Sequence, residues 1–113
     1  MKKDYTCVFY ETRTDKKPVE NFIDDLDDSS KDRFFYKKEL LELLGPKLRF
    51  PHTVLLGDEI FELRFTGKEG RIRVLFFFSH KRQVILLHGF VKKTKKIPKK
   101  EIKIAQQRKL KIQ

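Results

Sequence analysis

Residues 53–93, "TVLLGDEIFELRFTGKEGRIRVLFFFSHKRQVILLHGFVKK", decide the fold because their hydrophobic residues recur with a period of two. Such alternation predicts strands, and the breaks at "GD", "TGKEG" and "SHKR" predict turns between them. The strands are short and closely joined, which favours an antiparallel meander. The stretch ends in lysines, an abrupt change that a functional interpretation has to explain.

Side chains of opposite character alternate along the two middle strands of this stretch. The apolar set, which must face the core, consists of Phe61, Leu63, Phe65, Ile72, Val74, Phe76 and Phe78. The other face collects Glu62, Arg64, Arg71 and Arg73, beside Leu75 and Phe77. We expect helices to cover the apolar face and the charged face to stay open. The alternative explanation for Glu62 is an ordinary cross-strand ion pair with Arg64, Arg71 or Arg73.

The last strand adds a histidine whose placement the pattern leaves open. His88, Phe90 and Lys92 alternate, and either face of this strand has apolar residues to bury. On the charged face His88 would stand among arginines. The alternative role for His88 is that of a half-buried histidine with satisfied hydrogen bonds. Gly89 fits a bulge or bend, and we expect His52, in a connecting segment, to be solvated.

A strand and two helices are predicted before this stretch. The segment "YTCVFY" is typical of a first strand. Pro18 opens an amphipathic helix whose apolar side chains at i, i+3, i+4 and i+7 are Val19, Phe22, Ile23 and Leu26. A second helix is predicted over residues 29–44, with a capping arrangement of Ser29 and Asp32 at its start and Gly45 at its end.

A short terminal helix is predicted after the stretch. Pro98 suits a helix N-terminus, but the apolar face through Ile102 and Ala105 is weak, and Ile97 stands where a Ser or Thr would cap the helix. We therefore expect a loose end. The order β-α-α-β-β-β-β-α predicts a single domain over residues 1–113 in the α+β class. We expect the two N-terminal helices to pack on one face of a mainly antiparallel sheet, and the C-terminal helix to be short and basic.

The positive charge of the chain is concentrated near its end. The formal net charge is +11, and residues 92–113 contain ten of the 27 Lys and Arg residues but one of the 16 acidic residues. Such a block attracts a polyanion, and nucleic acid is the commonest one in a cytoplasm. A solvated helix that keeps the protein soluble is the alternative explanation.

Several classes of protein are disfavoured by composition. No apolar stretch approaches the about 20 residues that a membrane span needs, and the opening "MKKDYTCVFY" is too short an apolar run for a signal peptide. We expect a cytoplasmic protein without membrane partners. Cys7 is the only cysteine, which excludes an intrachain disulfide and a cysteine-based metal site. Among Tyr5, Val8 and Phe9, it is expected to pack as a small hydrophobic residue.

The residue types on the charged face suit phosphodiester chemistry. Cleaving RNA without a metal needs a base for the 2′-hydroxyl proton, cations for the charge developing on the phosphoryl oxygens, and an acid for the departing oxygen. The planar guanidinium of arginine matches two phosphate oxygens. An aromatic ring such as Phe77 or Phe90 suits stacking on an exposed base.

The motifs "FELRF", "GRIRVLFFF" and "VILLHGFVKKTKKIPKKEIKIA", in this order, resemble the phage-derived Gp49-like branch of the RelE/HigB toxins of bacterial toxin–antitoxin modules. The resemblance covers nearly the whole chain and is strongest from Glu62 to Ala105. It implies a RelE-like, microbial-ribonuclease-type fold and a type II toxin that cuts mRNA in the ribosomal A site without metal or other cofactor. It also implies the ribosome, mRNA and a HigA-like helix-turn-helix antitoxin as partners.

The resemblance also assigns roles to individual residues. Arg64 and Arg73 would hold the scissile phosphate, and His88 or Lys92 would handle protons. The positions implied to grip RNA are Arg71, Phe90, Lys93, Lys95, Lys96, Lys99 and Lys100. The lysine-rich end of the stretch then has an explanation, because a packed strand delivers lysines to the rim of an RNA-binding face.

A second interpretation comes from a different class. Some relatives of this fold poison DNA gyrase by binding it, and a basic sheet face suits simple nucleic-acid binding. For a ribonuclease, we expect Arg73→Ala or His88→Ala to leave the fold intact and abolish growth arrest. The first two helices are the expected antitoxin surface, through Val19, Phe22 and Tyr36.

Overall fold

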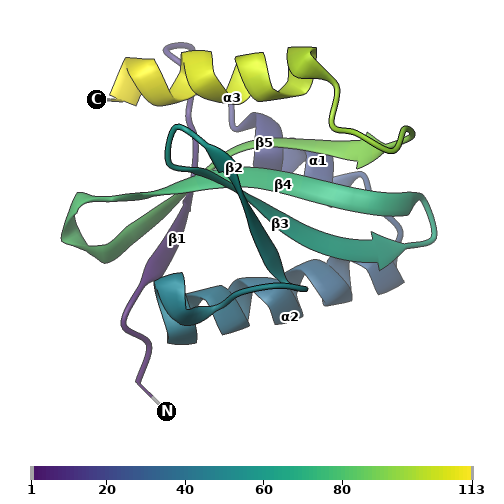
Figure 1. Cartoon of the computed structure of the whole chain (residues 1–113), viewed down its shortest axis with the longest axis horizontal. Helices are drawn as coiled ribbons and strands as arrows, with labels where there is room; N and C mark the ends of the chain where they lie inside the picture. Colours follow the sequence, from purple (N-terminus) through teal and green to yellow (C-terminus); the bar gives the residue numbers. More distant parts are fainter. Residues whose placement is uncertain (1, 113) are drawn as a thin grey trace.

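The chain folds into one five-stranded sheet with helices on both faces (Figure 1). The structure is a computed structural model and describes residues 2–112. Its elements are β1 (Thr6–Phe9), α1 (Pro18–Asp24), α2 (Asp28–Leu44), η1 (Gly45–Lys47), β2 (Thr53–Gly57), β3 (Ile60–Gly67), β4 (Gly70–Ser79), η2 (His80–Arg82), β5 (Gln83–Lys92) and α3 (Lys99–Ile112). The α+β class and the predicted order of helices and strands are confirmed.

The sheet has the strand order β1-β5-β4-β3-β2. Strands β2 to β5 form the predicted antiparallel meander, and β1 adds to its edge parallel to β5, so the sheet is mixed. The β2–β3 hairpin turns through Asp58 and Glu59, both with positive φ, which is the backbone that tight hairpins require. A register shift lies between Leu75 and Phe76, and not at the predicted position of Gly89.

The first core lies between the sheet and the two N-terminal helices, as predicted. Its fully buried members include Val19, Phe34, Leu41, Leu63, Ile72, Val74 and Phe76. Gly89 serves this packing: a Cβ there would lie 2.5 Å from Phe22 Cδ2, so the residue lets α1 approach β5. Val19 is fully buried by this packing and so offers no side chain to an antitoxin, whereas Phe22 is half-buried and Tyr36 is 61% exposed, and the antitoxin contact stays a prediction for these two.

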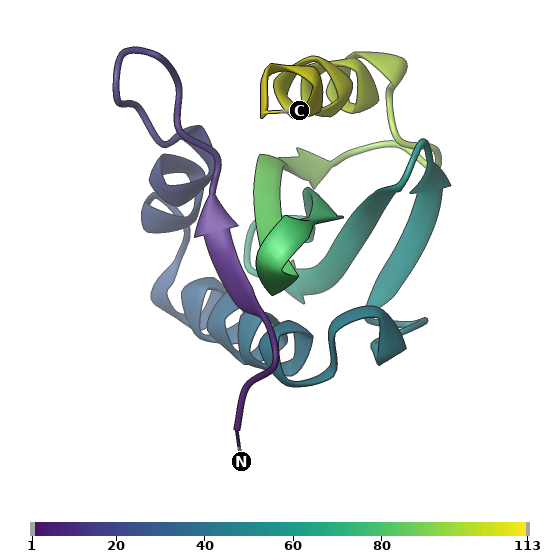
Figure 2. The same ribbon diagram turned by 90° about the vertical axis from the view of Figure 1, so that its left-hand side faces the viewer.

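The expectation of an open face opposite these helices is wrong over part of the sheet. Helix α3 lies on the other side of the sheet from α2 (Figures 1 and 2). There it covers a second core made of Tyr10, Ile60, Leu75, Phe77, Ile85, Leu87, Phe90 and Ala105. Leu75 and Phe77 supply the physical reason, because large apolar side chains on an open sheet face would stay in water. Phe77 is consequently buried and offers no ring to an exposed base.

Helix α3 is longer than the short, loose helix expected from its weak apolar face. It continues to Ile112, and polar contacts supplement the small contact surface of Ala105. Lys109 Nζ donates to Asp58 O at 2.6 Å, and Arg108 Nη1 donates to Leu87 O at 2.7 Å. Two of the basic residues near the C-terminus therefore anchor the helix to the sheet rather than extend into solvent.

The start of α2 differs from the predicted capping arrangement. Asp27, and not Ser29, is the N-cap, and its side chain accepts a hydrogen bond from Ser29 N at 3.0 Å.

Among residues 2–112, no helix is both long and apolar enough to cross a lipid bilayer.

Strand β1 is attached to α2 through a buried carboxylate. Glu42 accepts a hydrogen bond from Cys7 N at 2.9 Å and from Lys3 Nζ at 3.0 Å. Burial alone would raise its pKa, but these donors hold the pKa below the ordinary value. Cys7 packs against the first core, as predicted. Burial, aided by the Glu42 charge, raises the pKa of its thiol to about 12.

Candidate nucleic-acid interface

Four cationic side chains and one carboxylate share the sheet face opposite α1 and α2. In the sheet register, Arg64 of β3 pairs with Arg73 of β4, and Arg71 of β4 pairs with Lys92 of β5. Glu62 precedes Arg64 by two residues and so points to the same face. We refer to these five residues as the sheet cluster. Alternation along β3 and β4 was sufficient to predict that the three arginines and Glu62 share one face, whereas the face of Lys92 was left open.

The centre of the sheet cluster is a buried ion pair. Arg73 and Glu62 are each 3% exposed, and Arg73 Nε lies 3.6 Å from Glu62 Oε2. Arg64 Nε lies 3.5 Å from the other carboxylate oxygen. Arg73 Nη1 also donates to Ile72 O at 3.0 Å. The cross-strand ion pair considered from the sequence is thus present. Arg73 was expected on an open surface, but it is buried.

The accessible cations of the sheet cluster surround this pair. Arg71 is exposed, and the Arg64 side chain is 30% exposed. Lys92 is half-buried, and burial lowers the pKa of its ammonium. The nearby charge of Glu62 opposes that shift, while those of the arginines add to it. Neutral Lys92 is therefore more available near neutral pH than an ordinary lysine.

His88 lies on the face of Leu75, its partner across β4 and β5, but it is not free. Its Nε2 donates to Glu101 Oε1 of α3 at 2.8 Å, and both side chains are mostly buried. The ring stacks on Phe90 with centroids 5.5 Å apart. Burial lowers the pKa of His88 despite this carboxylate. His88 thus lies on the charged face, but as a histidine with satisfied hydrogen bonds and not as a free group among the arginines.

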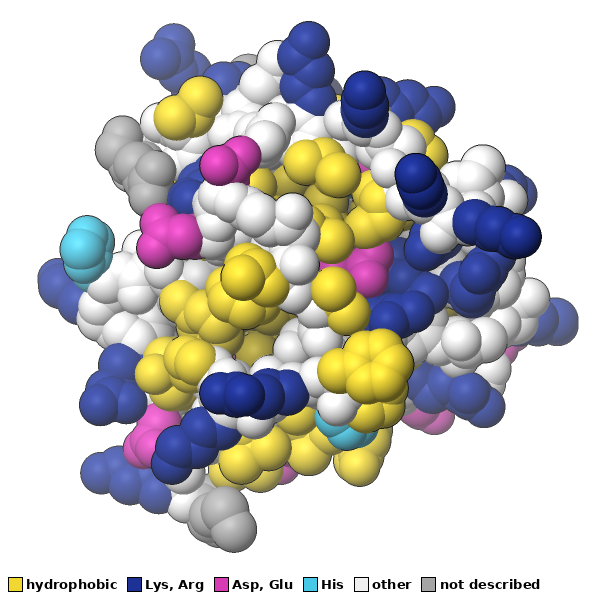
Figure 3. Space-filling model, viewed as in Figure 1, with side chains coloured by type: hydrophobic (Ala, Val, Ile, Leu, Met, Phe, Trp, Pro, Cys, Tyr) yellow, Lys and Arg dark blue, Asp and Glu magenta, His cyan; other side chains and the backbone are white. Residues whose placement is uncertain are grey.

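Phe90 and the lysines differ in exposure. Phe90 is 7% exposed beneath α3, so its expected role of stacking on an RNA base does not fit its position. Lys93, Lys95, Lys96, Lys99 and Lys100 are all exposed. They follow β5 through the connection to α3, and Lys and Arg side chains gather on the right-hand side of Figure 3, where this connection lies. The structure brings these lysines to the margin of the sheet cluster.

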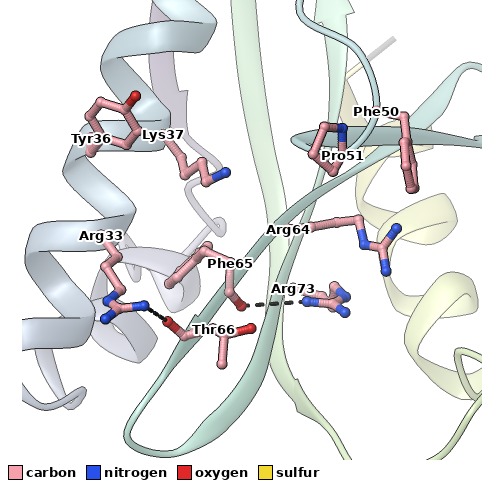
Figure 4. A pocket seen from close by; sticks show the side chains of 9 residues that line it. All are labelled: Arg33, Tyr36, Lys37, Phe50, Pro51, Arg64, Phe65, Thr66 and Arg73. Carbon is pink, nitrogen blue, oxygen red and sulfur yellow. Dashed lines mark hydrogen bonds between the residues drawn. The ribbon is translucent and has the colours of Figure 1, made fainter.

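A basic pocket opens beside β3, on the side of α2. It has a volume of about 500 Å³ and is lined by Arg33, Tyr36, Lys37, Phe50, Pro51, Arg64, Phe65, Thr66 and Arg73 (Figure 4). We call it the edge pocket. Its lining contains four cations and no carboxylate. Arg64 and Arg73 belong to both the edge pocket and the sheet cluster, so the two sites are continuous.

The sequence analysis missed the α2 and loop residues of this pocket. The spacing of Arg33, Tyr36 and Lys37 places them on one helix face, which is the one local signal that was available. His52, expected to be solvated, is partly buried, and its Nδ1 lies 2.7 Å from Lys37 Nζ. Burial and the Lys37 charge lower the pKa of His52, so neutral His52 accepts this hydrogen bond.

Residues 2–112 contain no group of three or more His, Cys, Asp and Glu side chains arranged to hold a metal ion.

Residues 21–110, well over half of the chain, match the family described as Phage derived protein Gp49-like (DUF891). The chain belongs to this family. No curated protein matches it. The matched range includes every residue of the sheet cluster and of the edge pocket.

Proposed function

We propose that this Gp49-like protein is the toxin of a type II toxin–antitoxin pair, acts as a ribosome-dependent endoribonuclease on mRNA, and has a helix-turn-helix antitoxin as its partner. The observation that carries the proposal is the convergence of Arg64, Arg71 and Lys92 on one sheet face beside the lysine-rich connection. Membership of a family that is often related to toxin–antitoxin systems supports the biological role.

The chemistry proposed for the sheet cluster is attack of the RNA 2′-oxygen on the adjacent phosphorus. Lys92, whose pKa burial lowers, takes the 2′-hydroxyl proton. Arg64 and Arg71 pair with the phosphoryl oxygens, on which negative charge develops. The P–O5′ bond breaks, and the departing oxygen takes a proton from solvent. The products are a 2′,3′-cyclic phosphate and a 5′-hydroxyl end.

Arg73 and His88 have supporting roles in this proposal. Arg73 orients Glu62 and through it Arg64, because one carboxylate lies within 3.6 Å of both guanidinium groups. His88 holds the first turn of α3 through Glu101, and so fixes the end of the lysine-rich connection. His88 is a positioning residue that does not touch RNA, and at the sheet cluster Arg73 acts through Glu62.

The experiment that tests the proposal is induction of the chain in a bacterium while new RNA 5′ ends are mapped across translated messages. Wild-type protein is expected to arrest growth and to produce cuts in phase with codons. Arg71→Ala and Lys92→Ala, at positions that are not fully buried, are expected to remove both effects while the protein stays folded. Lys47→Ala, which removes an exposed cation outside the site, is the matched control. Cuts that persist in both site variants would overturn the assignment.

Binding without cleavage is the second candidate function. The buried Glu62–Arg73 pair and the His88–Glu101 pair occupy two of the four side chains that the family resemblance made catalytic. A protein that only binds nucleic acid, or a gyrase poison, needs the exposed cations but no free proton-transfer group. Growth arrest with undamaged messages, accompanied by DNA damage signalling in the gyrase case, would favour this alternative.

A further inference from the structure

The edge pocket has more positive charge than its surroundings balance. Arg33 Nη1 donates to Thr66 O at 3.0 Å, and the polar partner of Lys37 is neutral His52. Within residues 2–112, neither cation has a carboxylate within 4 Å. Partial burial also lowers the pKa of Lys37. A concave site with unpaired cations is a site that favours an anion.

An unpartnered buried donor adds to this demand. Arg73 lines the edge pocket, its side chain is 4% exposed, and its Nε has no hydrogen-bond partner among the described residues. The nearby Glu62 oxygen lies beyond hydrogen-bonding distance, at 3.6 Å, so it balances charge without accepting the hydrogen. Buried donors without acceptors are uncommon and call for an explanation.

Exposed aromatic rings show which kind of anion fits. Phe50 is 75% exposed and Tyr36 is 61% exposed, on the loop wall and the helix wall of the edge pocket (Figure 4). The Arg64 guanidinium lies over the Phe50 ring, 5.7 Å from its centroid. Cations beside exposed rings suit a phosphate and a base together, since every base presents a face for stacking. Inorganic phosphate would use the cations and leave the rings in water.

We infer that the edge pocket binds one nucleotide of single-stranded RNA, with its phosphate at Arg33 and Lys37 and its base on Phe50. The inference rests on the proposed function, which it deepens by adding a second contact for the strand. Arg64 joins the two sites, so a strand held at the sheet cluster continues around the edge of β3 toward α2. A volume of about 500 Å³ accommodates one nucleotide.

The test measures binding of a fluorescein-labelled, 2′-O-methylated RNA octamer to the purified chain by fluorescence anisotropy. The methyl groups prevent cleavage, so binding is measured alone. Lys37→Gln removes a charge but keeps a donor for His52, and we expect at least about tenfold weaker binding. We also expect the slope of log K against log salt to become shallower by about one. Phe50→Ala is expected to weaken binding at least about fivefold without changing that slope.

Lys47→Gln is the matched control, since it removes an exposed charge outside the pocket. Affinities for Lys37→Gln and Phe50→Ala that equal the control would overturn the inference. Competition by adenosine monophosphate, by the unlabelled octamer and by inorganic phosphate identifies the source of the ligand. Displacement by the octamer alone supports a strand, whereas equal displacement by phosphate and by the mononucleotide would contradict recognition of a base.

Failure of the inference and of the proposed function are distinguishable. If wild-type protein cuts messages in cells and Lys37→Gln binds RNA like the control, the pocket assignment alone is wrong. If the pocket variants lose RNA binding but wild-type protein produces no cuts, the ribonuclease assignment is wrong and the nucleotide site stands.

Discussion

Glu62 and Arg73 face each other across β3 and β4 as a buried ion pair in which Glu62 Oε2 and Arg73 Nε lack any hydrogen-bond partner among the described residues. Their separation of 3.6 Å balances the two charges but leaves a donor and an acceptor unsatisfied. Such a pair is sensitive to loss of one member, because the other then loses its buried counter-charge. Without Arg73, Glu62 would keep only the partly exposed Arg64, whose Nε lies 3.5 Å from the carboxylate. This arrangement changes what an alanine substitution at Arg73 can show.

The first prediction is that Arg73→Ala destabilises the fold instead of leaving it intact. Loss of the guanidinium leaves the Glu62 carboxylate, 4% exposed, without its buried cation. We expect a loss of about 3–5 kcal/mol in the free energy of unfolding, measured by urea denaturation. Arg71→Ala, an exposed neighbour on the same strand, is expected to change it by less than about 0.5 kcal/mol. Equal stability of the two variants would contradict a buried pair.

The second prediction concerns pH. His88 and His52 both have pKa values lowered below 6.5, chiefly by burial, although Glu101 opposes the shift of His88 and Arg108 adds to it. The unfolded chain therefore binds protons below about pH 6.5 that the folded chain does not. Stability is full above that value and decreases as the pH falls from there toward the folded pKa values.

The measurement is the thermal unfolding midpoint between about pH 7.5 and about pH 5.5. His88→Gln, whose amide still donates to Glu101, is expected to flatten the decrease because one of the two histidines is gone. His80→Gln, which removes an exposed histidine of the η2 turn, is the matched control for loss of an imidazole. A midpoint that rises on acidification would show that His88 is charged in the folded protein.

The third prediction concerns the contact of α1 with the sheet. Gly89→Ala places a methyl group 2.5 Å from Phe22 Cδ2, so helix and strand must separate. We expect a loss of about 1–3 kcal/mol in unfolding free energy. In the Phe22→Ala background the same substitution should cost less, because the clashing ring is absent. A double-mutant cycle measures this coupling, and additive effects would show that the two residues act independently.

The fourth prediction concerns Cys7. A thiol pKa of about 12 instead of 9.0 reduces the thiolate about a thousandfold at pH 8. Iodoacetamide should therefore alkylate the folded protein very slowly, as followed by mass spectrometry. The same protein in denaturant, which exposes Cys7, provides the reference rate. Comparable rates in the two conditions would mean that β1 does not protect the thiol.

The sequence pattern placed Glu62 and the three arginines of the sheet cluster correctly, because a period of two is a local property of each strand, but it left the face of Lys92 open. The hairpins then set the register, so Arg64 and Arg73 became neighbours without any long-range information. The cover of Phe90 by α3 was not predictable in this way. Helix α3 is held by Ala105 and by the polar anchors of Arg108 and Lys109, which its hydrophobic pattern does not reveal.

The edge pocket could not be predicted because its walls come from distant segments. The pairing of β2 with β3 ends at Thr53 and Leu63, so β3 extends beyond β2 from Arg64 onward. Lys37 of α2 and Phe50 of the following loop line the pocket together with this Arg64. A lysine such as Lys37 is ordinary on a helix surface. The Lys37 side chain is unusual because it is partly buried beside neutral His52, and this property exists only in the folded chain.

The last prediction separates two roles for Lys92 in RNA cleavage. As a general base it must lose its proton, which burial promotes by lowering its pKa. Lys92→Arg keeps a positive charge beside Arg71, but its guanidinium stays protonated at any physiological pH. If Lys92 is the base, Lys92→Arg and Lys92→Ala should both abolish the in-phase cuts in translated messages, although Lys92→Arg should still bind RNA about as tightly as wild type. If Lys92 only attracts phosphate, Lys92→Arg should retain cleavage, and the proton acceptor must be sought elsewhere on the sheet face.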